Sequence, residues 1–394
     1  MNSRIKTTLI LHANIVTLDR VLAQGYAFLQ GDIIQETGPM QELDPQLLQL
    51  AEEIIDAGGF WLLPGFIDVH VHGGDGHDFM DASAEALEGI TRFHGSHGTT
   101  TMLATTTTAP QEELAKVLQS VHSFRNKQMP YAQLEGVHLE GPFISPAYPG
   151  AQNPAYIVAP RQQWIDDWTR QYPGLIRLLT LAPEREGALP LIEKLSGQGI
   201  VVACGHTDAT YAQIREAVRH GLRHAVHTFN AMKGLHHREP GVVGAVLTED
   251  AIGAEMIADG RHIHPACIRL LMQVKRNDNL MLVTDAISAA GLGDGDYRFG
   301  GLEVTVRNGA ATLKDGRTLA GSTLTMIDAF RFMVNTIGAS VPEVSRMASH
   351  NPAKALGIAD RTGSIAPGKQ ADLLLVSPEL SIDKVWVKGS LVLF

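Results

Sequence analysis

Cysteine and positive charge are both scarce in this chain. Its 394 residues include only two cysteines, Cys204 and Cys267, which cannot make a disulfide framework. Because Cys204 also lies inside a buried-looking strand, the cysteine content suits a reducing compartment, and we expect a cytoplasmic protein. The N-terminal stretch has short apolar segments that His12 and Asp19 interrupt, so we predict neither a signal peptide nor a membrane span.

Lysine and arginine together number 32, against 42 aspartate and glutamate residues, which gives a formal net charge of −10. This balance argues against the basic surface that binds nucleic acids or anionic membranes, and we expect neither as a partner. An anionic substrate would have to be held by a local pocket. Apolar residues make up 44% of the chain, which is enough to bury a sizeable core. The length fits a barrel of about 250 to 300 residues plus a small companion domain.

The middle of the chain alternates apolar runs with segments of helical periodicity. Runs such as 200–202 and 281–283 are near-continuously apolar, as buried parallel strands are. Helical spacing appears between most runs, at 84–94, 112–124, 211–220 and 265–274, and later at 324–336 and 342–349. We predict an α/β fold, a (β/α)8 TIM-like barrel, whose strands lie at 66–72, 99–106, 134–140, 176–182, 200–205, 225–229, 252–258 and 280–285.

Both ends of the chain show short strand patterns instead. Strands are predicted at 8–18, 26–29, 33–37 and 53–56, and again at 372–376, 384–387 and 391–394. We expect the two ends to meet in a small β-sandwich domain made of residues 1–62 and 358–394. The barrel then takes residues 63–357, with a hairpin insert near 297–313 that turns at Asn308-Gly309.

Side chains of metal-ligand type stand at or just beyond the ends of the predicted barrel strands. In chain order they are His70, His72, Glu140, His206, His227 and Asp285. Because barrel active sites gather at the carboxyl ends of the strands, we expect these side chains to share one cavity. The arrangement predicts a metal-dependent hydrolase.

Each of the proposed ligands has a reason to bind metal. Residues two apart on a strand point to the same face, so His70 and His72 can meet one ion. Glu140 closes an apolar run, where an unpaired acid is costly to bury. With His206 and His227 it supplies the carboxylate and two imidazoles of a catalytic zinc that keeps a position open for water. Taken singly, each has a plainer alternative. The first-strand pair could belong to a polar strand face, Glu140 could cap a loop, and His206 and His227 could be core histidines.

Asp285 ends the last predicted barrel strand. A carboxylate at this place can take a proton from the attacking water and later deliver it to the leaving group. The alternative role is a cap on the next segment, which Ser288 could provide as well. We predict the catalytic role.

Longer motifs run through the chain nearly from end to end. They are Pro64-Gly65-Phe66-Ile67-Asp68, His138-Leu139-Glu140-Gly141-Pro142, Gly205-His206-Thr207, His227-Thr228-Phe229-Asn230-Ala231-Met232, Arg238-Glu239-Pro240-Gly241, Ile257-Ala258-Asp259-Gly260, Thr284-Asp285-Ala286 and Ala320-Gly321-Ser322-Thr323-Leu324. By these motifs the sequence resembles the N-acetylglucosamine-6-phosphate deacetylases of the amidohydrolase superfamily. The closing segment at 363–373 is similar to the ending of the superfamily in general.

The resemblance implies that Glu140, His206 and His227 hold the main divalent ion and that Asp285 is the general base and acid. Many binuclear relatives bridge their ions with a carboxylated lysine at the end of the fourth strand, but residues 178–184 contain no lysine. Glu140 is therefore the expected bridge. The first-strand histidines at 70 and 72 leave one or two ions per subunit as alternatives. Zinc is the expected metal, with Fe2+, Mn2+ or Co2+ as alternatives.

The resemblance also implies a set of substrate-binding residues: Ala151, Gln152, Asn230, Ala231, Arg238, Asp259, His262, Leu319, Ala320 and Gly321. Arg238 and His262 match positions that reach the phosphate from a neighbouring subunit, which implies a homodimer. The planar fork of arginine suits phosphate oxygens, although a solvated loop charge is the plainer interpretation of Arg238. Gln152 stands where family members usually carry a histidine; its amide can donate a hydrogen bond but cannot supply a proton at neutral pH.

The implied reaction is hydrolysis of the N-acetyl group of N-acetylglucosamine 6-phosphate to glucosamine 6-phosphate and acetate, a step of amino sugar catabolism. One alternative is the same reaction on N-acetylgalactosamine 6-phosphate. More remote alternatives are a cyclic-amide hydrolase or a deaminase, whose neutral rings would not need the phosphate-binding set. The last is a non-catalytic sugar-phosphate binder, which would have no use for a buried acid beside a metal.

Overall fold

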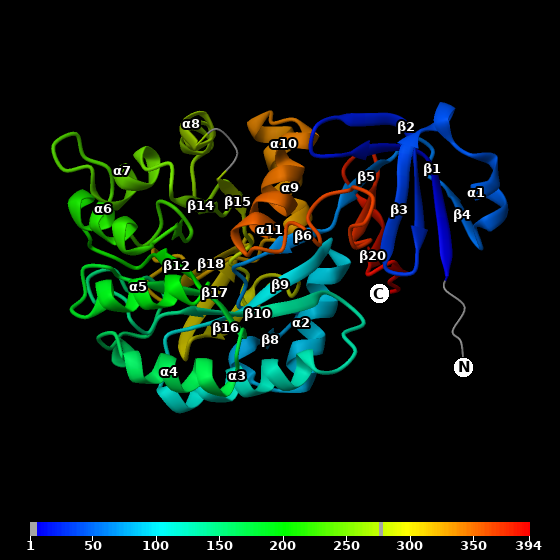
Figure 1. Ribbon diagram of the computed structural model, residues 1–394. Coiled ribbons are helices and arrows are strands. Elements are labelled where there is room, and N and C mark those ends of the chain that lie inside the picture. The colour runs from blue at the N-terminus through cyan, green and yellow to red at the C-terminus, as the bar shows by residue number, and fades with distance from the viewer. Residues whose placement is uncertain (1–5, 276–278) are drawn as a thin grey trace.

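Parallel strands form a barrel at the centre of the protein, and helices pack around it (Figure 1). The computed structural model describes residues 6–275 and 279–394. Eight neighbouring strands are hydrogen-bonded in chain order, namely β6 (Phe66–Asp68), β9 (Thr99–Thr106), β10 (Gln133–Glu140), β11 (Ile176–Leu181), β12 (Val201–Cys204), β13 (His224–Ala225), β14 (Gly253–Met256) and β15 (Leu280–Leu282). Each predicted barrel strand overlaps one of them, although the prediction at 225–229 shares only Ala225 with β13, and the predicted fold class is confirmed.

The segments that follow β6 and β15 bring the barrel close to closure. The backbone N–H of Asp285 donates to the carbonyl of His70 at 2.8 Å, and the N–H of His72 donates to the carbonyl of Ala286 at 2.8 Å. The first and last strands of the barrel are therefore joined at the level of the predicted site.

Helices follow most of the barrel strands, as the fold requires. The hydroxyl of Thr210 accepts from the backbone N–H of Gln213 and starts one of them, which Gly221 ends with a φ of 115°. The predictions at 84–94, 112–124, 211–220 and 265–274 are confirmed. The helices are α2 (Ala84–Ser96), α3 (Gln111–Arg125), α4 (Gln162–Gln171), α5 (Ala188–Gly197), α6 (Tyr211–His220), α7 (Gly241–Thr248), α8 (Pro265–Lys275), α9 (Met326–Phe332), α10 (Val341–Ser345) and α11 (Asn351–Ala355), with π-helical turns η4 (Met333–Ile337) and η5 (Arg346–His350) and 3-10 turns η2 (Phe79–Asp81) and η3 (Pro154–Tyr156).

Apolar side chains fill the inside of the barrel. Most strands, or the residues just after them, contribute to this cluster, which includes Ile67, Leu103, Leu178, Ala203, Val226, Ile257 and Val283. A larger cluster fills the space between the strands and the helices, and β9 is buried along its whole length. Such burial on both faces is what produces near-continuous apolar runs in the sequence.

Strands from both ends of the chain form a separate sheet beside the barrel (Figure 1). Its path is β21-β20-β19-β5-β1-β2-β3, with β4 also paired to β1. The bounds are β1 (Thr7–Val16), β2 (Val21–Gln30), β3 (Ile33–Pro39), β4 (Glu53–Asp56), β5 (Trp61–Pro64), β19 (Leu373–Val376), β20 (Ile382–Val387) and β21 (Ser390–Leu391), and η1 (Met40–Glu42) and α1 (Pro45–Leu50) connect β3 to β4.

Neighbouring residues of β1 belong to different apolar clusters, which shows that both faces of the terminal sheet are covered. Ile10 belongs to a cluster with Trp386, and Leu9 belongs to one with Leu47 of α1. The prediction that the two chain ends meet in one small β structure is confirmed. The boundaries 62/63 and 357/358 stay a prediction, and residues 1–5 of the predicted domain lie outside the described residues.

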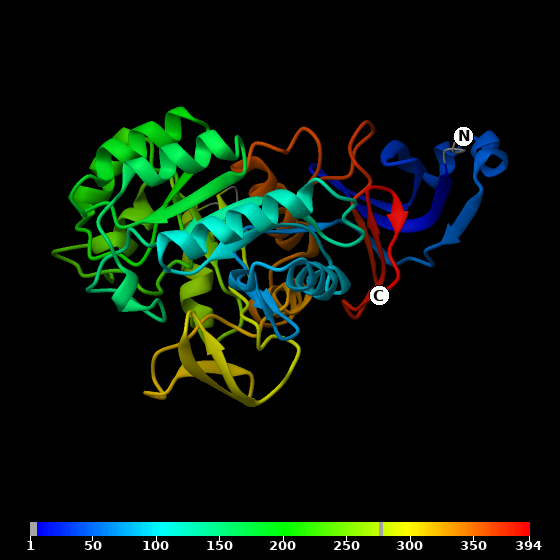
Figure 2. The ribbon, with the colours of Figure 1, turned by 90° about the horizontal axis from the view of Figure 1, so that it is seen from below.

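An antiparallel sheet projects from the barrel between β15 and α9 (Figure 2). It consists of β16 (Gly295–Phe299), β17 (Leu302–Arg307) and β18 (Ala310–Leu313). The predicted turn at Asn308-Gly309 joins the last two strands, whereas the first strand makes this insert one hairpin larger than predicted, because Gly300-Gly301 supplies a second turn. A smaller hairpin, β7 (Gly73–Gly74) and β8 (His77–Asp78), follows β6. Within the described ranges, no helix is both long and apolar enough to cross a membrane.

Candidate active site

The predicted metal ligands come from several barrel strands and meet at one end of the barrel. Glu140 is the last residue of β10, and His206 and His227 lie two residues beyond β12 and β13. His206, His227 and Asp285 adopt positive φ angles of 48°, 28° and 49°. Such backbone is costly for residues other than glycine and concentrates at functional sites. The chain therefore turns sharply where these side chains enter the site.

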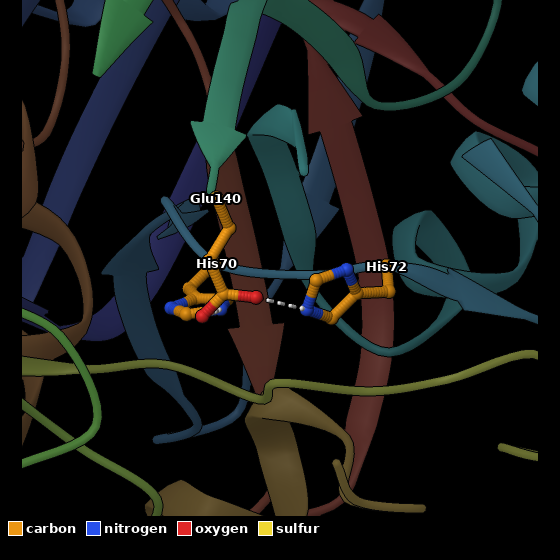
Figure 3. Close-up of side chains that lie close together, drawn as sticks. All are labelled: His70, His72 and Glu140. Atoms are coloured by element: carbon orange, nitrogen blue, oxygen red, sulfur yellow. Dashed lines mark ion pairs between the residues drawn. The ribbon is translucent and has the colours of Figure 1, made fainter. Parts of the chain in front are cut away.

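Glu140 lies at the centre of the cluster. Its Oε1 lies 3.3 Å from Nε2 of His70, 3.2 Å from Nε2 of His206 and 3.1 Å from Nε2 of His227. Its Oε2 lies 3.3 Å from Nε2 of His72, and Figure 3 shows the imidazoles of His70 and His72 on either side of the carboxylate. Two groups with the spacing of metal ligands result, His70–His72–Glu140 and Glu140–His206–His227, and they share Glu140.

In three of these histidines, Nδ1, the ring nitrogen that does not face Glu140, lies beside a hydrogen-bond acceptor. Nδ1 of His206 and Nδ1 of His227 each lie 3.1 Å from a backbone carbonyl oxygen. Nδ1 of His70 lies 2.8 Å from the carboxylate of Glu255. Because these oxygens only accept, each Nδ1 is the nitrogen that carries a proton, and each Nε2 is the atom that can bind a cation beside Glu140. Within the described part of the chain, Nε2 of His70 is also buried without a hydrogen bond, as expected of an atom placed to bind metal.

Electrostatics also favour a cation at this place. Burial by itself would raise the pKa of Glu140, but the imidazoles of His70 and His206 hold it well below its usual value. Burial would likewise raise the pKa of Asp285, yet His70 and His72 lower it. Burial alone would lower the pKa of His72, whereas Asp285 and Glu140 raise it to about 9. The two acids are thus ionised, and their negative charge is stabilised by nearby positive charge. A divalent ion supplies that charge when it replaces the protons on the imidazoles. The donor set of imidazoles and carboxylates suits such an ion.

Glu255, a residue of β14, connects the site to the barrel interior and was missed by sequence reasoning. It is fully buried and accepts from Nδ1 of His70 at 2.8 Å, from Nε2 of His224 at 2.8 Å and from the backbone N–H of His227 at 3.2 Å. Burial would raise the pKa of Glu255, but His70 and His224 lower it, so the carboxylate is ionised.

Two further buried polar groups support the first barrel strand. Asp68 accepts from the hydroxyl of Thr284 at 2.6 Å, and burial raises the pKa of Asp68 to about 7. His138 lies 3.1 Å from the carbonyl of Val69 and 2.8 Å from the hydroxyl of Thr180. Burial keeps the pKa of His138 well below its usual value, so this imidazole is neutral.

A cavity of about 290 Å³ opens onto the cluster and contains most of the predicted site. The predicted residues that line it are His72, Glu140, His206, His227 and Asp285, together with Ala151, Gln152, Asn230, Ala231, His262, Leu319 and Gly321. Gly150, Phe299, Arg317 and Thr318 line it as well and were not predicted. Phe299 and Arg317 belong to the insert or its exit, whose position over the barrel has no local signal in the sequence.

Three of the predicted substrate-binding residues do not line the cavity, and a fourth, His262, lines the cavity of its own chain. His262 lines the cavity of its own chain, because it follows β14, although we expected it to reach in from a neighbour. Asp259 does not line the cavity but holds His262, accepting from Nδ1 at 2.7 Å. Ala320 is buried in the apolar cluster of the insert. Arg238 is exposed on the loop before α7, and its Nη1 lies 2.8 Å from Nε2 of His237.

Comparison with known proteins identifies the family. The family model described as "Amidohydrolase family" matches residues 61–392. N-acetylglucosamine-6-phosphate deacetylase of Bacillus subtilis (strain 168) is 38% identical over 389 residues, covering 98% of this chain and 97% of that protein. N-acetylgalactosamine-6-phosphate deacetylase of Escherichia coli O157:H7 is 38% identical over 333 residues, covering 84% of this chain and 88% of that protein.

A solved structure agrees with these relatives. It is a variant of N-acetyl-D-glucosamine-6-phosphate deacetylase from Mycobacterium smegmatis in complex with N-acetyl-D-glucosamine-6-phosphate. It superposes with a TM-score of 0.91 at 33% identity and covers 99% of this chain and 100% of that chain. The chain therefore belongs to the amidohydrolase family and, within it, to the family of N-acetylglucosamine-6-phosphate deacetylases.

Proposed function

We propose that this protein hydrolyses the acetamide of N-acetylglucosamine 6-phosphate to glucosamine 6-phosphate and acetate, in amino sugar catabolism. The observation that carries the proposal is the placement of Asp285 beside the cluster of Glu140, His206 and His227 in one cavity. The relatives of that name and the substrate complex of the M. smegmatis protein support the choice of substrate.

A divalent ion is part of the proposal. Glu140, His206 and His227 would hold the main ion, and His70 and His72 with Glu140 would hold a second. We propose zinc, because neutral imidazoles and carboxylates are its usual ligands in hydrolases, while Fe2+, Mn2+ and Co2+ suit the same set. When bound, such an ion would polarise the acetamide carbonyl and would lower the pKa of a water molecule, so that the water loses its proton easily.

Asp285 would move the proton. Its Oδ1 lies 3.2 Å from Nε2 of His72, so the carboxylate stands at the wall of the metal cluster and faces the cavity. In its ionised form it takes a proton from the attacking water, and it then delivers that proton to the nitrogen of the leaving amine. The water oxygen forms a bond to the acetyl carbon, the C–N bond breaks, and acetate and the amino sugar phosphate leave.

Gln152 would support this centre from the side of the substrate. Its Nε2 donates to Oε2 of Glu140 at 2.5 Å, and its Oε1 accepts from the backbone N–H of Thr108 at 2.6 Å. The amide is therefore held at both ends. We propose that it orients Glu140 and offers a hydrogen bond to the substrate, but transfers no proton.

The phosphate would lie in the same cavity. Asn230, Ala231 and His262 line the cavity and are the groups that we propose for the phosphate, and Asp259 fixes the imidazole of His262. Arg238 lies outside its own cavity on an exposed loop, which supports the proposal that it reaches the phosphate of a partner subunit in a homodimer. Leu235 on the same loop is 57% exposed, as a residue that packs against a partner would be in one isolated chain.

The cytoplasm is the proposed location. Cys204 and Cys267 are both free thiols, which suits a reducing compartment. The proposed substrate is also a charged phosphosugar, which does not cross a membrane unaided, so the enzyme has to share a compartment with it.

A second candidate substrate is N-acetylgalactosamine 6-phosphate, which the relative from E. coli O157:H7 favours. The experiment that tests both is acetate release from the two N-acetylhexosamine 6-phosphates, measured side by side with zinc-loaded protein. We expect the higher kcat/KM with the gluco sugar. A higher value with the galacto sugar would replace the proposed substrate, and release from neither would support a non-catalytic binder.

A further inference from the structure

We propose that Glu255, held in place by His224, is the positioning residue that makes the His70–His72–Glu140 group a metal site. The inference rests on the proposed function in one respect, namely that a divalent ion binds at this end of the barrel. It adds two residues that do not line the cavity and that touch neither substrate nor ion.

Both oxygens of Glu255 are engaged inside the barrel. Oε2 accepts from Nδ1 of His70 at 2.8 Å and from the backbone N–H of His227 at 3.2 Å. Oε1 accepts from Nε2 of His224 at 2.8 Å. A fully buried carboxylate is costly unless every oxygen is paired, so its presence here calls for a role that an apolar residue could not fill.

The contact with His70 decides what that ring can do. An acceptor at Nδ1 keeps the proton on that atom and leaves Nε2 as the donor atom for metal. The same contact turns the ring so that Nε2 lies 3.3 Å from Glu140 and 3.6 Å from Asp285. A carboxylate behind an imidazole also makes the ring a more basic ligand than a carbonyl does.

The first-strand pair depends on this contact more than the other ligands do. Nδ1 of His206 and Nδ1 of His227 are held by backbone carbonyls, which no side-chain substitution removes. Nδ1 of His72 is buried and, within the described ranges, has no hydrogen-bond partner. His70 is therefore the one member of its histidine pair whose Nδ1 is held by a hydrogen bond, and Glu255 accepts that bond.

His224 gives Glu255 its orientation. It is the first residue of β13, three positions before the ligand His227, and is 1% exposed. With His224 on one oxygen and His70 on the other, the carboxylate group is held in a single plane. The chain of contacts His224–Glu255–His70 thus runs along the barrel interior and ends at the metal cluster.

Glu255→Gln tests the proposal with little change in shape. An amide offers one acceptor and one donor, so it cannot accept from both imidazoles at once. The readout is zinc bound per chain, by atomic emission, after equilibration with chelators of graded strength. We expect the zinc that depends on His70 to bind about 10- to 100-fold more weakly, while the zinc held by His206 and His227 stays.

Asp372→Asn is the matched control. Asp372 is a buried carboxylate next to the terminal sheet that also accepts three hydrogen bonds, from Lys388, Thr362 and Gln370. We expect this variant to lose stability but to keep the zinc affinity of the wild type. An equal loss of zinc in both variants would mean that any buried amide substitution loosens the site, and would overturn the proposal.

A second variant keeps the test decisive if Glu255→Gln fails to fold. His224→Phe leaves Glu255 in place but removes its anchor, and we expect a smaller loss of zinc affinity in the same direction. Unchanged zinc affinity in whichever of these variants fold would overturn the proposal. A wild-type protein that binds no divalent ion would instead overturn the proposed function, so the two failures are distinct.

Discussion

Replacing Asp285 by asparagine removes the proposed proton acceptor and leaves the shape of the site in place. The backbone of Asp285 is fixed by its own N–H, which donates to the carbonyl of His70 at 2.8 Å, and by the N–H of Ser322, which donates to its carbonyl at 2.7 Å. The side chain is 12% exposed and lies at the wall of the cavity. Asparagine fits the same space but cannot take a proton from water at neutral pH.

The magnitude follows from the role. General acid–base catalysis by one positioned group contributes about 100- to 10,000-fold, so kcat should fall by that factor, or by about 3 to 5 kcal/mol of activation free energy. KM should change little, because the substrate contacts of the cavity remain. Zinc content should stay at the wild-type value, because Glu140, His206 and His227 are untouched.

The assay is acetate release under saturating substrate, with zinc measured on the same preparation. Asp296→Asn, an exposed change in the insert, serves as the control and should keep wild-type turnover. A kcat for Asp285→Asn within tenfold of the wild type, at full zinc content, would remove Asp285 from the mechanism. A loss of zinc in this variant would show instead that Asp285 is needed as a ligand.

Four further predictions concern binding and stability. Arg238→Ala should raise KM for the phosphorylated sugar, and an equal loss on an unphosphorylated analogue would contradict a phosphate contact. Arg317→Ala should raise the same KM because this side chain lines the cavity, and an unchanged KM would place it outside the substrate site. Removal of the ion by a chelator should lower the melting temperature and added zinc should restore it, since an ion that binds only the folded state stabilises it; a melting temperature insensitive to zinc would argue against the site. Trp386→Ala should cost about 3 to 5 kcal/mol in urea unfolding because the side chain is fully buried, and a cost below about 1 kcal/mol would contradict that packing.

Much of the barrel could be predicted because its signals are local. Strand β9 at Thr99–Thr106 was predicted to the residue, since a strand covered on both faces reads as one buried run. Helix α6 at Tyr211–His220 was predicted to the residue as well, because a capping threonine and a closing glycine mark its ends. Glu140, the last residue of β10, was predicted from its place at a strand end. In a barrel the carboxyl ends of the strands meet at one face, so residues at these ends lie close together.

The supporting groups could not be predicted in this way. Glu255 sits in a short strand and contacts His70 across 185 residues of sequence, so no spacing or motif connects the two. Arg317 reaches the cavity only because the insert folds over the barrel end. For His262, the sequence gives the residue but not the subunit whose cavity it lines. Such facts depend on tertiary packing and not on local pattern.

The most direct test of the central claim is a zinc titration of metal-free protein, with acetate release from N-acetylglucosamine 6-phosphate as the readout. The claim is that Glu140, His206 and His227 hold an ion beside Asp285 and that this centre hydrolyses the acetamide. Activity should be absent without metal, should rise with added zinc and should reach a plateau at one or two ions per chain. Full activity in protein shown to be free of divalent metal would contradict the account.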